Sequence, residues 1–242
     1  SKSMMVGLSD YTPISNQLCI IENHSNDVRQ CMYAIGYGSY LITPAHLFKY
    51  NNGEITIRST RGLYKMRNSI QVKIHPIECR DMTIIQLPKD FPPFPQRLKF
   101  EMPNRDHRVC LVGVNFQQNF SSCVVSESSV VAPKGNCTFW KHWISTTDGQ
   151  CGLPLVDVIN KSIVGIHSLA ATNSKTNFFV TIPDNFEAYL HNLVTMNKWE
   201  MGWHYNPNLI AWNGLNLVDS APSGKFKTAK LVKDIMCEVT EQ

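Results

Sequence analysis

The sequence predicts an all-β protein built from two β-barrels that pack against each other. Short runs of β-branched and aromatic residues recur along most of the chain, and turn residues separate them. Many short strands at fairly even spacing, with few helical stretches, are typical of barrels and sandwiches. The chain has 242 residues, of which 43% are apolar. This length allows two packed barrels of roughly 100 residues each.

The predicted strands follow one another through most of the chain. They cover residues 31–37, 40–43, 54–59, 62–67, 82–87, 108–114, 123–131, 138–145, 162–169 and 177–182. Turn residues at 51–53, 133–135 and 147–149 lie between several of them. One helix is expected, from Asp184, which can cap it, to about Leu193, because the apolar residues of this segment then share one face.

A proline cluster at residues 88–95 suggests where the two barrels are joined. Such a segment supports neither a helix nor a central strand, so an ordered linker is expected there. The predicted organisation is an N-terminal barrel over residues 1–105, a C-terminal barrel over 106–220 and a tail over 221–242. No apolar run approaches the roughly 18 residues of a membrane span, so no membrane partner is expected.

The spacing of the cysteines bears on metal binding, and the distribution of charge bears on RNA binding. The eight cysteines include no C-x-x-C pair, and no histidine lies near them at zinc-ligand spacing. No metal and no other cofactor is therefore expected. The net charge of +4 comes from scattered basic residues. This scattered pattern favours a solvated basic surface over an RNA-binding one.

Residues 149–152 contain the first candidate for catalysis, Cys151 between Gly149 and Gly152. A nucleophile at a tight glycine turn is exposed to a substrate carbonyl. The backbone N–H groups of Cys151 and Gly149 can then form an oxyanion hole. The alternative is a buried structural cysteine in a glycine-containing turn.

His46 and Asp81 are the candidates that complete the chemistry. His46 follows a predicted strand and can act as the general base for a thiol. Asp81 enters an apolar strand, where burial is costly without a partner, and orienting a histidine is one such role. Taken singly, a structural histidine and a turn aspartate paired with Arg80 are the alternatives. The order His, Asp, nucleophile is that of chymotrypsin-like enzymes, and it agrees with the all-β pattern.

A substrate pocket is predicted around His167, which lies in the strand expected at residues 162–169. The edge of that strand can pair with an extended peptide. A neutral histidine there can donate a hydrogen bond to a side-chain carbonyl, which suits glutamine. Thr146 and Asp148 are close enough in sequence to complete the pocket. A buried core histidine is the alternative for His167.

Several motifs along the chain resemble those of the nuclear inclusion a proteases of plant potyviruses. They are Asp10-Tyr11, Pro13-Ile14-Ser15, His46-Leu47-Phe48, Asn51-Asn52-Gly53, Arg80-Asp81, residues 88–100 (PKDFPPFPQRLKF), Asn115-Phe116-Gln117, residues 139–144 (FWKHWI), residues 148–152 (DGQCG) and residues 164–168 (VGIHS). The resemblance implies a chymotrypsin-like fold of two six-stranded antiparallel β-barrels with short helices and a C-terminal tail.

The resemblance also implies a function, a viral polyprotein-processing cysteine endopeptidase. The implied enzyme cuts after Gln and before Ser, Gly or Ala, within an extended recognition sequence. It implies a triad of His46, Asp81 and Cys151, and a glutamine pocket of Thr146, Asp148 and His167. By alignment, further pockets are expected to involve Leu169, Phe178, Trp212 and Leu217, for which ordinary core positions are the alternative. The expected location is the host cytoplasm and nucleus.

The terminal residues agree with the implied function, and two other functions are the alternatives. The chain begins with Ser1 and ends in Gln242, as products of such cleavage would, so its own C-terminus is a possible ligand. An RNA-binding or scaffold protein with a silent site is one rival, but it would be free to lose Cys151. A thiol esterase is another, but it gives no reason for the strand around His167 or for the terminal glutamine.

Overall fold

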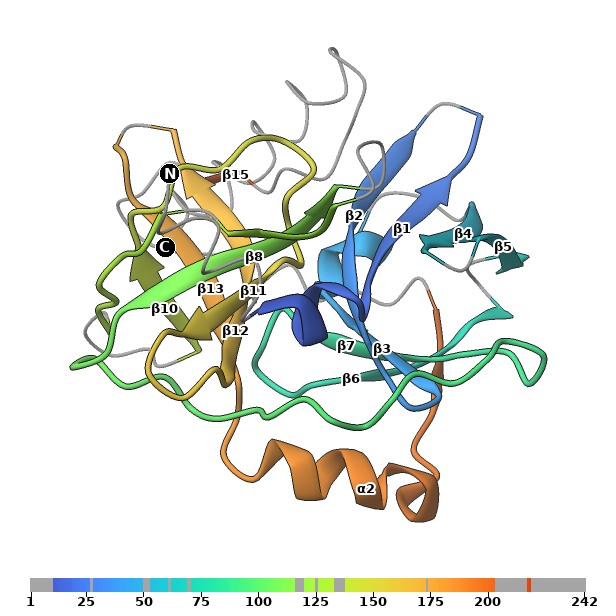
Figure 1. Ribbon diagram of the computed structural model, residues 1–242. Coiled ribbons are helices and arrows are strands. Elements are labelled where there is room, and N and C mark those ends of the chain that lie inside the picture. The colour runs from blue at the N-terminus through green and yellow to red at the C-terminus, as the bar shows by residue number, and fades with distance from the viewer. Residues whose placement is uncertain are drawn as a thin grey trace.

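The structure is a computed structural model that describes residues 11–202 and 217–218, except residues 27, 50–52, 61, 69–70, 116–119, 125, 133–137 and 173. Figure 1 shows two antiparallel β-sheets side by side, with one α-helix lying below them. This arrangement confirms the predicted all-β fold. The tail at 221–242 lies outside the described residues.

The first sheet takes its strands mainly from the N-terminal half of the chain. Its strand order is β14-β6-β7-β3-β2-β1-β4-β5. The bounds are β1 (Leu18–His24), β2 (Arg29–Tyr37), β3 (Tyr40–Thr43), β4 (Glu54–Ser59), β5 (Gly62–Asn68), β6 (Lys73–Pro76), β7 (Thr83–Gln86) and β14 (Glu200–Met201). A 3₁₀ turn, η1 (Ala45–Phe48), follows β3 directly.

The second sheet is formed by later strands, in the order β10-β13-β12-β11-β8-β9, and β15 pairs with β12. The bounds are β8 (Val109–Asn115), β9 (Phe120–Val124), β10 (Phe139–His142), β11 (Pro154–Asp157), β12 (Ile163–Ala171), β13 (Asn177–Thr181) and β15 (Leu217–Val218). The described strands number eight and seven instead of six in each sheet, and they include the two-residue strands β14 and β15.

The two sheets share one hydrophobic core. Buried apolar residues from both sheets form a single cluster, which runs from Tyr11 to Leu193. In β1 the buried side chains alternate with partly exposed ones, as expected for a strand with one face on a core. β12 is buried along nearly its whole length. A strand buried on both faces is well placed to hold polar side chains at fixed positions.

Most predicted strands coincide with observed ones, but the sequence does not predict β1, β6, β11, β14 or β15, and the strand expected at residues 123–131 overlaps β9 only at residues 123–124. β6 ends and β11 begins at a proline, which weakens the strand pattern of each. The strand expected at residues 138–145 ends at His142. The chain leaves the first sheet after Gln86, enters the second at Val109, and returns to the first at β14. The three domain boundaries stay a prediction.

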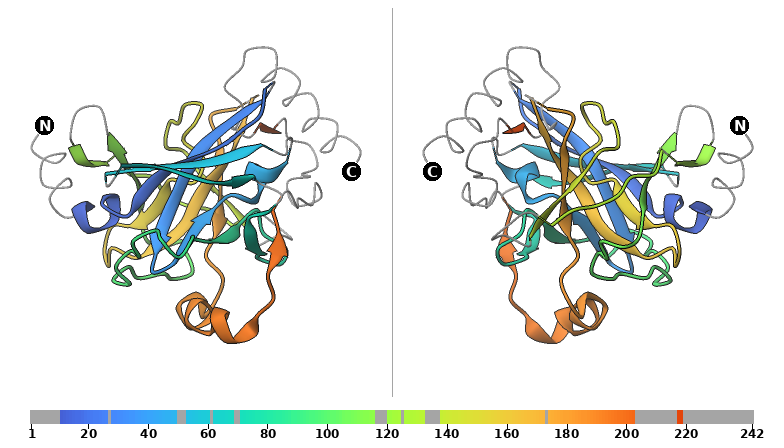
Figure 2. Two further views of the ribbon diagram at one scale, coloured as in Figure 1. Left: turned by 90° about the vertical axis from the view of Figure 1, so that its right-hand side faces the viewer. Right: turned by 90° about the vertical axis from the view of Figure 1, so that its left-hand side faces the viewer.

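The expected helix is α2 (Phe186–Met196), which is longer than predicted. Asn185, not Asp184, occupies the N-cap position, and no side chain caps the helix by a hydrogen bond. Figure 2 shows α2 projecting away from both sheets. Among the described helices, none has the length and apolar character needed to cross a membrane.

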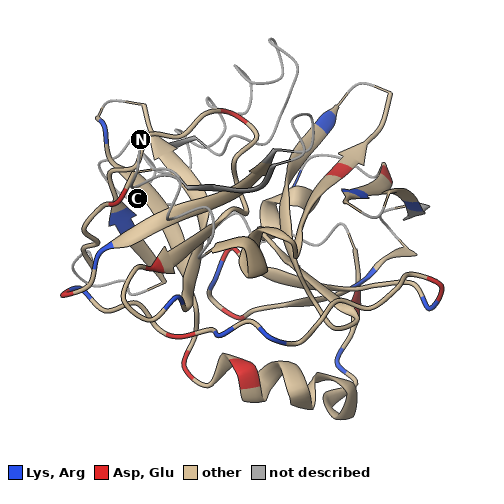
Figure 3. Cartoon of the chain, viewed as in Figure 1, with Lys and Arg blue, Asp and Glu red and all other residues tan. Residues whose placement is uncertain are grey.

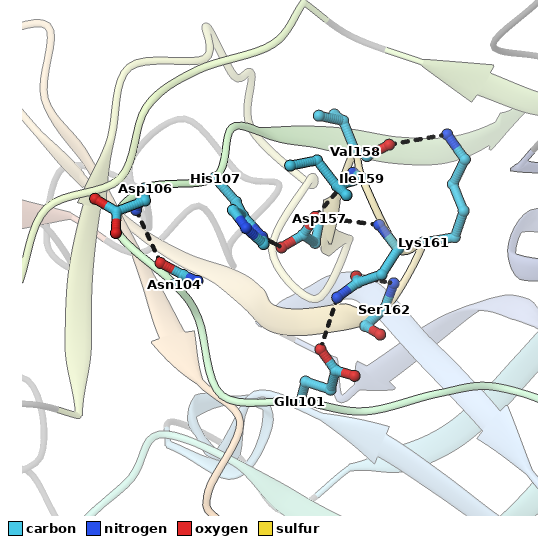
Figure 4. A network of polar contacts seen from close by, with 10 residues as sticks. Glu101, Asn104, Asp106, His107, Asp157, Val158, Ile159, Lys161 and Ser162 are labelled. Carbon is cyan, nitrogen blue, oxygen red and sulfur yellow. Dashed lines mark hydrogen bonds and ion pairs between the residues drawn. The ribbon is translucent and has the colours of Figure 1, made fainter.

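A polar network joins the turn between β11 and β12 to the segment that precedes β8 (Figure 4). β12 is the strand that carries His167. The Nδ1 atom of His107 lies 2.6 Å from Oδ2 of Asp157. The other oxygen of Asp157 accepts a hydrogen bond from the backbone N–H of Ile159 at 2.8 Å. Asn160 Nδ2 donates to Glu101 Oε2 at 2.9 Å. These contacts hold the hairpin against the segment that precedes β8.

Candidate active site

The structure brings His46 and Asp81 into direct contact. His46 lies in η1 just after β3, and Asp81 lies just before β7, which pairs with β3 in antiparallel register. Oδ2 of Asp81 is 2.6 Å from Nδ1 of His46, and Oδ1 accepts the backbone N–H of His46 at 2.9 Å. Both side chains are fully buried. The carboxylate therefore contacts the ring as the predicted triad requires, and Nε of Arg80 donates to the backbone oxygen of Thr181.

Buried amides from β1 and β2 hold the turn that carries His46. Nε2 of Gln30 donates to the backbone oxygen of His46 at 2.9 Å. Nδ2 of Asn23 donates to the backbone oxygen of Leu47 at 3.0 Å. A short 3₁₀ turn has few internal hydrogen bonds of its own, so these side chains fix its position relative to the sheet.

Asp81 is held in its charged form by its partners. Burial alone would raise the pKa of Asp81. The charge of His46 and hydrogen bonds from His46 and Ser168 act in the opposite direction and outweigh it, so the pKa lies below its ordinary value. The Ser168 hydroxyl donates to Oδ2 of Asp81 at 2.6 Å. The site therefore contains a buried carboxylate that can stabilise a histidine cation.

Cys151 belongs to the same group of contacts through Ser168. Its Sγ–H donates to the backbone oxygen of Ser168 at 3.1 Å. Its own carbonyl accepts the backbone N–H of Tyr33, in β2 of the first sheet, at 2.8 Å. The next residue, Gly152, donates its N–H to His167 O at 2.8 Å. Cys151 is thus fixed at the junction of the two sheets, and it is fully buried, not exposed as the glycine turn predicted.

Ser168 contacts both Asp81 and Cys151, and the sequence does not predict it as a site residue. In the pairing of β12 with β13, His167 faces Phe179 and Leu169 faces Phe178, so Ser168 is the extra residue of a β-bulge. A bulge re-aims the residue it contains. Here it accompanies a hydroxyl directed to Asp81 and a carbonyl directed to Cys151. The motif VGIHS contained Ser168, but an alternating strand pattern gives no indication of a bulge.

The Cys151 turn uses glycine for two different reasons. Gly149 and Gly152 have φ values of +86° and +91°, which side-chain-bearing residues seldom adopt. A Cβ atom on Gly152 would also lie 1.9 Å from the backbone oxygen of Tyr33. Gly149 has open space around it. The turn is therefore shaped by backbone conformation at Gly149 and additionally by close packing at Gly152.

The predicted glutamine pocket is placed only in part. His167 is buried, and its Nδ1 atom lies 3.1 Å from Nε2 of His142, a residue that the sequence analysis left without a role. Thr146 is half-buried and Asp148 is exposed, in the segment between β10 and β11. No hydrogen bond joins either of them to His167 in the described part of the chain. The pocket assignment stays a prediction.

Of the other four predicted pocket residues, the structure describes Leu169, Phe178 and Leu217. Leu169 and Phe178 are fully buried and face each other across β12 and β13. Leu217 lies in β15, opposite Ala171 of β12, and Trp212 lies outside the described residues. Among the described residues no group of three or more His, Cys, Asp or Glu could hold a metal ion.

The family model of peptidase family C4 matches residues 1–233 of the chain. The genome polyprotein of soybean mosaic virus (strain G2) is 47% identical over 236 residues, which make up 97% of this chain. That of turnip mosaic virus (strain Japanese) is 45% identical over the same length. The chain spans only about 8% and 7% of these two relatives.

Solved structures of similar proteins have the same fold. Tobacco vein mottling virus protease is 44% identical with a TM-score of 0.78, covering 84% of this chain and 93% of that chain. A catalytically inactive tobacco etch virus protease complexed with substrate is 45% identical with a TM-score of 0.76, covering 81% and 92%. The chain therefore belongs to peptidase family C4, as its resemblance to potyvirus proteases implied, and it has a chymotrypsin-like protease fold.

Proposed function

We propose that this chain is a cysteine endopeptidase that processes a viral polyprotein by cleaving after glutamine and before Ser, Gly or Ala. The observation that carries the proposal is the chain of contacts from His46 through Asp81 and Ser168 to Cys151. It unites a thiol, an imidazole and a carboxylate, which are the groups that acyl transfer by a cysteine nucleophile requires. Membership of a peptidase family and the polyprotein relatives support the substrate class.

In the proposed mechanism, His46 removes the Cys151 proton through Nε2, and the thiolate attacks the main-chain carbonyl carbon of the glutamine. Backbone N–H groups of Gly149 and Cys151 stabilise the oxyanion. The intermediate collapses to a thioester as His46 gives its proton to the leaving amine. A water molecule, deprotonated by His46, then hydrolyses the thioester and regenerates the thiol. Asp81 orients His46 throughout and stabilises its cationic form.

The proposed recognition site lies along β12. His167 supplies a hydrogen bond to the glutamine side chain, and Thr146 and Asp148 complete that pocket. The peptide pairs with β12 near Leu169 in place of β15, because β13 lies along one edge of β12 and β11 and β15 lie along the other. The tobacco etch virus protease complexed with substrate, 45% identical to this chain, supports an extended peptide as ligand. Phe178, Trp212 and Leu217 are retained as candidates for the pockets upstream of the glutamine.

Three further expectations rest on the resemblance and on the terminal sequence. They are weak RNA binding, location in the host cytoplasm and nucleus, and binding of the chain's own C-terminus as a product. Figure 3 shows Lys and Arg of the described residues dispersed among acidic ones. A salt-sensitive retention on RNA that survives Cys151→Ala would support an RNA-binding role independent of catalysis.

The test is cleavage of peptides that contain Glu-Val-Thr-Glu-Gln before Ser, the sequence that ends this chain followed by its first residue. Wild type is expected to cut only after Gln. Cys151→Ala is expected to lower kcat by at least about 10⁴-fold, since loss of a nucleophile removes the covalent route. Cys110→Ala is the matched control, because burial raises the pKa of the Cys110 thiol to about 11 and it lies outside the site. Folded wild type that cuts neither the peptide nor its own junction in a longer precursor would refute the proposal.

A further inference from the structure

We propose that His142 is a positioning residue that fixes the tautomer of His167, so that the pocket presents an N–H donor to the side-chain oxygen of glutamine. This inference rests on the proposed function and deepens it, since it names the group that makes His167 a donor. His142 lies at the end of β10, and His167 lies in β12, with β13 between the two strands. Sequence reasoning gave His142 no role.

The hydrogen bonds of His142 determine where its proton is. The backbone N–H of Ile144 donates to Nδ1 of His142 at 3.1 Å. A backbone amide can only donate, so this nitrogen carries a lone pair and the proton of the neutral ring is on Nε2. That atom is 3.1 Å from Nδ1 of His167. His142 therefore donates to His167.

The hydrogen bond from His142 also determines where the proton of His167 is. Because its Nδ1 accepts the hydrogen bond from His142, the proton of a neutral His167 is on Nε2. A chain of donors thus runs from the Ile144 amide through both rings and ends in the Nε2–H of His167. The rings meet edge to face, with centroids 5.3 Å apart and planes at 75°. This tautomer can donate to an amide carbonyl and cannot accept from an N–H at Nε2.

Both rings are kept neutral by their surroundings. Burial, and next the nearby His167, lower the pKa of His142 well below its ordinary value. Burial, and next the nearby His46, lower the pKa of His167 to about 3. A second proton on His142 would also place an N–H against the Ile144 N–H. A neutral donor suits the uncharged glutamine amide, whereas a carboxylate buried beside it would have no counter-charge.

The frame around His142 prevents an easy change of partner. Nδ2 of Asn177, a residue of β13 that faces His142, donates to the backbone oxygen of Ile144 at 2.6 Å. Ile144 is thus held from both sides, and its amide stays directed at His142. Phe179 is paired with His167 in the neighbouring strand, and its ring centroid lies 6.1 Å from that of His142. Both rings therefore lie in a packed layer of β10, β13 and β12.

The first experiment measures kcat/KM on two peptides that differ only in Gln or Glu before the cleaved bond. His142→Phe keeps a ring but removes both nitrogens, so His167 Nδ1 loses its donor. We expect the preference for Gln over Glu to fall at least about ten-fold, because a site built around a hydrogen bond discriminates through it. His142→Gln, which can still donate to His167, is expected to recover most of the preference. His75→Phe replaces another buried histidine, and this variant is expected to keep the preference for Gln over Glu.

The second measurement reads the tautomer directly in the unaltered chain by ¹⁵N-resolved NMR of histidine-labelled protein. His167 is expected to carry its proton on Nε2 in wild type and to lose that preference in His142→Phe. A proton on Nδ1 of wild-type His167, or an unchanged Gln preference in a folded His142→Phe, would overturn the inference. Failure of wild type to prefer Gln at all would instead overturn the proposed function, so the two failures are distinguishable.

Discussion

Ser168 is the residue through which the two sheets share one group of polar contacts. Its hydroxyl donates to Asp81, which belongs to the first sheet's side of the site. Its carbonyl accepts from Cys151, and the residue itself lies in β12 of the second sheet. A bulge in the β12–β13 pairing makes both contacts possible at one position. We therefore expect Ser168 to position the proposed triad without reacting itself.

Replacing Ser168 by Ala tests this role. The backbone bond to Cys151 remains, but the buried Asp81 carboxylate loses one of its donors, and its pKa is expected to rise. Hydrogen bonds to charged groups contribute about 1.5–3 kcal/mol, so kcat/KM is expected to fall about 10- to 100-fold. Initial rates on a cleavable peptide measure the effect.

Ser128→Ala is the matched control for this substitution. Ser128 is also buried, and its hydroxyl donates to a backbone oxygen at 2.7 Å and accepts the Trp143 N–H at 3.0 Å. We expect this variant to lose stability while keeping its rate. Equal rates for wild type and a folded Ser168→Ala variant would contradict the positioning role.

The turn that carries Cys151 depends on a close approach between a loop of the second sheet and a strand of the first. Tyr33 in β2 donates its N–H to the Cys151 carbonyl at 2.8 Å. The Tyr33 oxygen in turn accepts from the Thr43 hydroxyl at 3.0 Å, and it leaves no room for a side chain on Gly152. The turn and β2 therefore form one structural element of the site, although they are far apart in sequence.

Gly152→Ala is expected to destabilise the protein far more than a glycine substitution at a surface hairpin. Both a positive φ and a backbone clash oppose it, so we expect a loss of at least about 4 kcal/mol in unfolding free energy. Gly62→Ala is the control, because Gly62 has φ +128° but open space around it. Its expected cost is about 1–3 kcal/mol. Urea unfolding of both variants gives the comparison, and equal losses would show that the close approach is unimportant.

The stability of the whole molecule is expected to depend on pH through two buried histidines, His142 and His167. His142 and His167 have pKa values lowered by burial, to about 3 for His167, whereas in the unfolded chain they take their ordinary value near 6.5. Below pH 6.5 the unfolded chain therefore binds protons that the folded chain excludes. The unfolding free energy consequently falls as the pH falls, and for His167 this continues down to about pH 3.

The expected slope is up to about 1.4 kcal/mol per pH unit for each of the two histidines. Asp81 acts in a lower window, because its depressed pKa stabilises the fold above its ordinary value of 3.8, and this is lost as the pH falls through the folded-state pKa. Urea unfolding at intervals between pH 7.5 and 4.5 measures the histidine part. His142→Phe is expected to reduce the slope by the contribution of one histidine. An unfolding free energy of wild type that does not change with pH would contradict the lowered pKa values.

The fold class and the main candidates for catalysis can be predicted from local sequence patterns. Alternation of apolar residues and the placing of turn residues depend on neighbours along the chain, so the all-β class and strands such as β2, β4 and β13 could be predicted. The helix α2 could be predicted for the same reason. The order of His46, Asp81 and Cys151 pointed to one arrangement of nucleophile and base, and the structure places His46 against Asp81.

The contacts that join residues distant in sequence could not be predicted from such patterns, because they depend on how the strands pack. The bulge at Ser168, the approach of Tyr33 to Cys151 and the pairing of His142 with His167 depend on strand register and on how two sheets meet. A pattern with a period of two residues carries no information about which strands become neighbours, or where one of them gains an extra residue. For that reason local sequence indicated which chemistry the chain can perform, while packing between the sheets decided which side chains hold it in place.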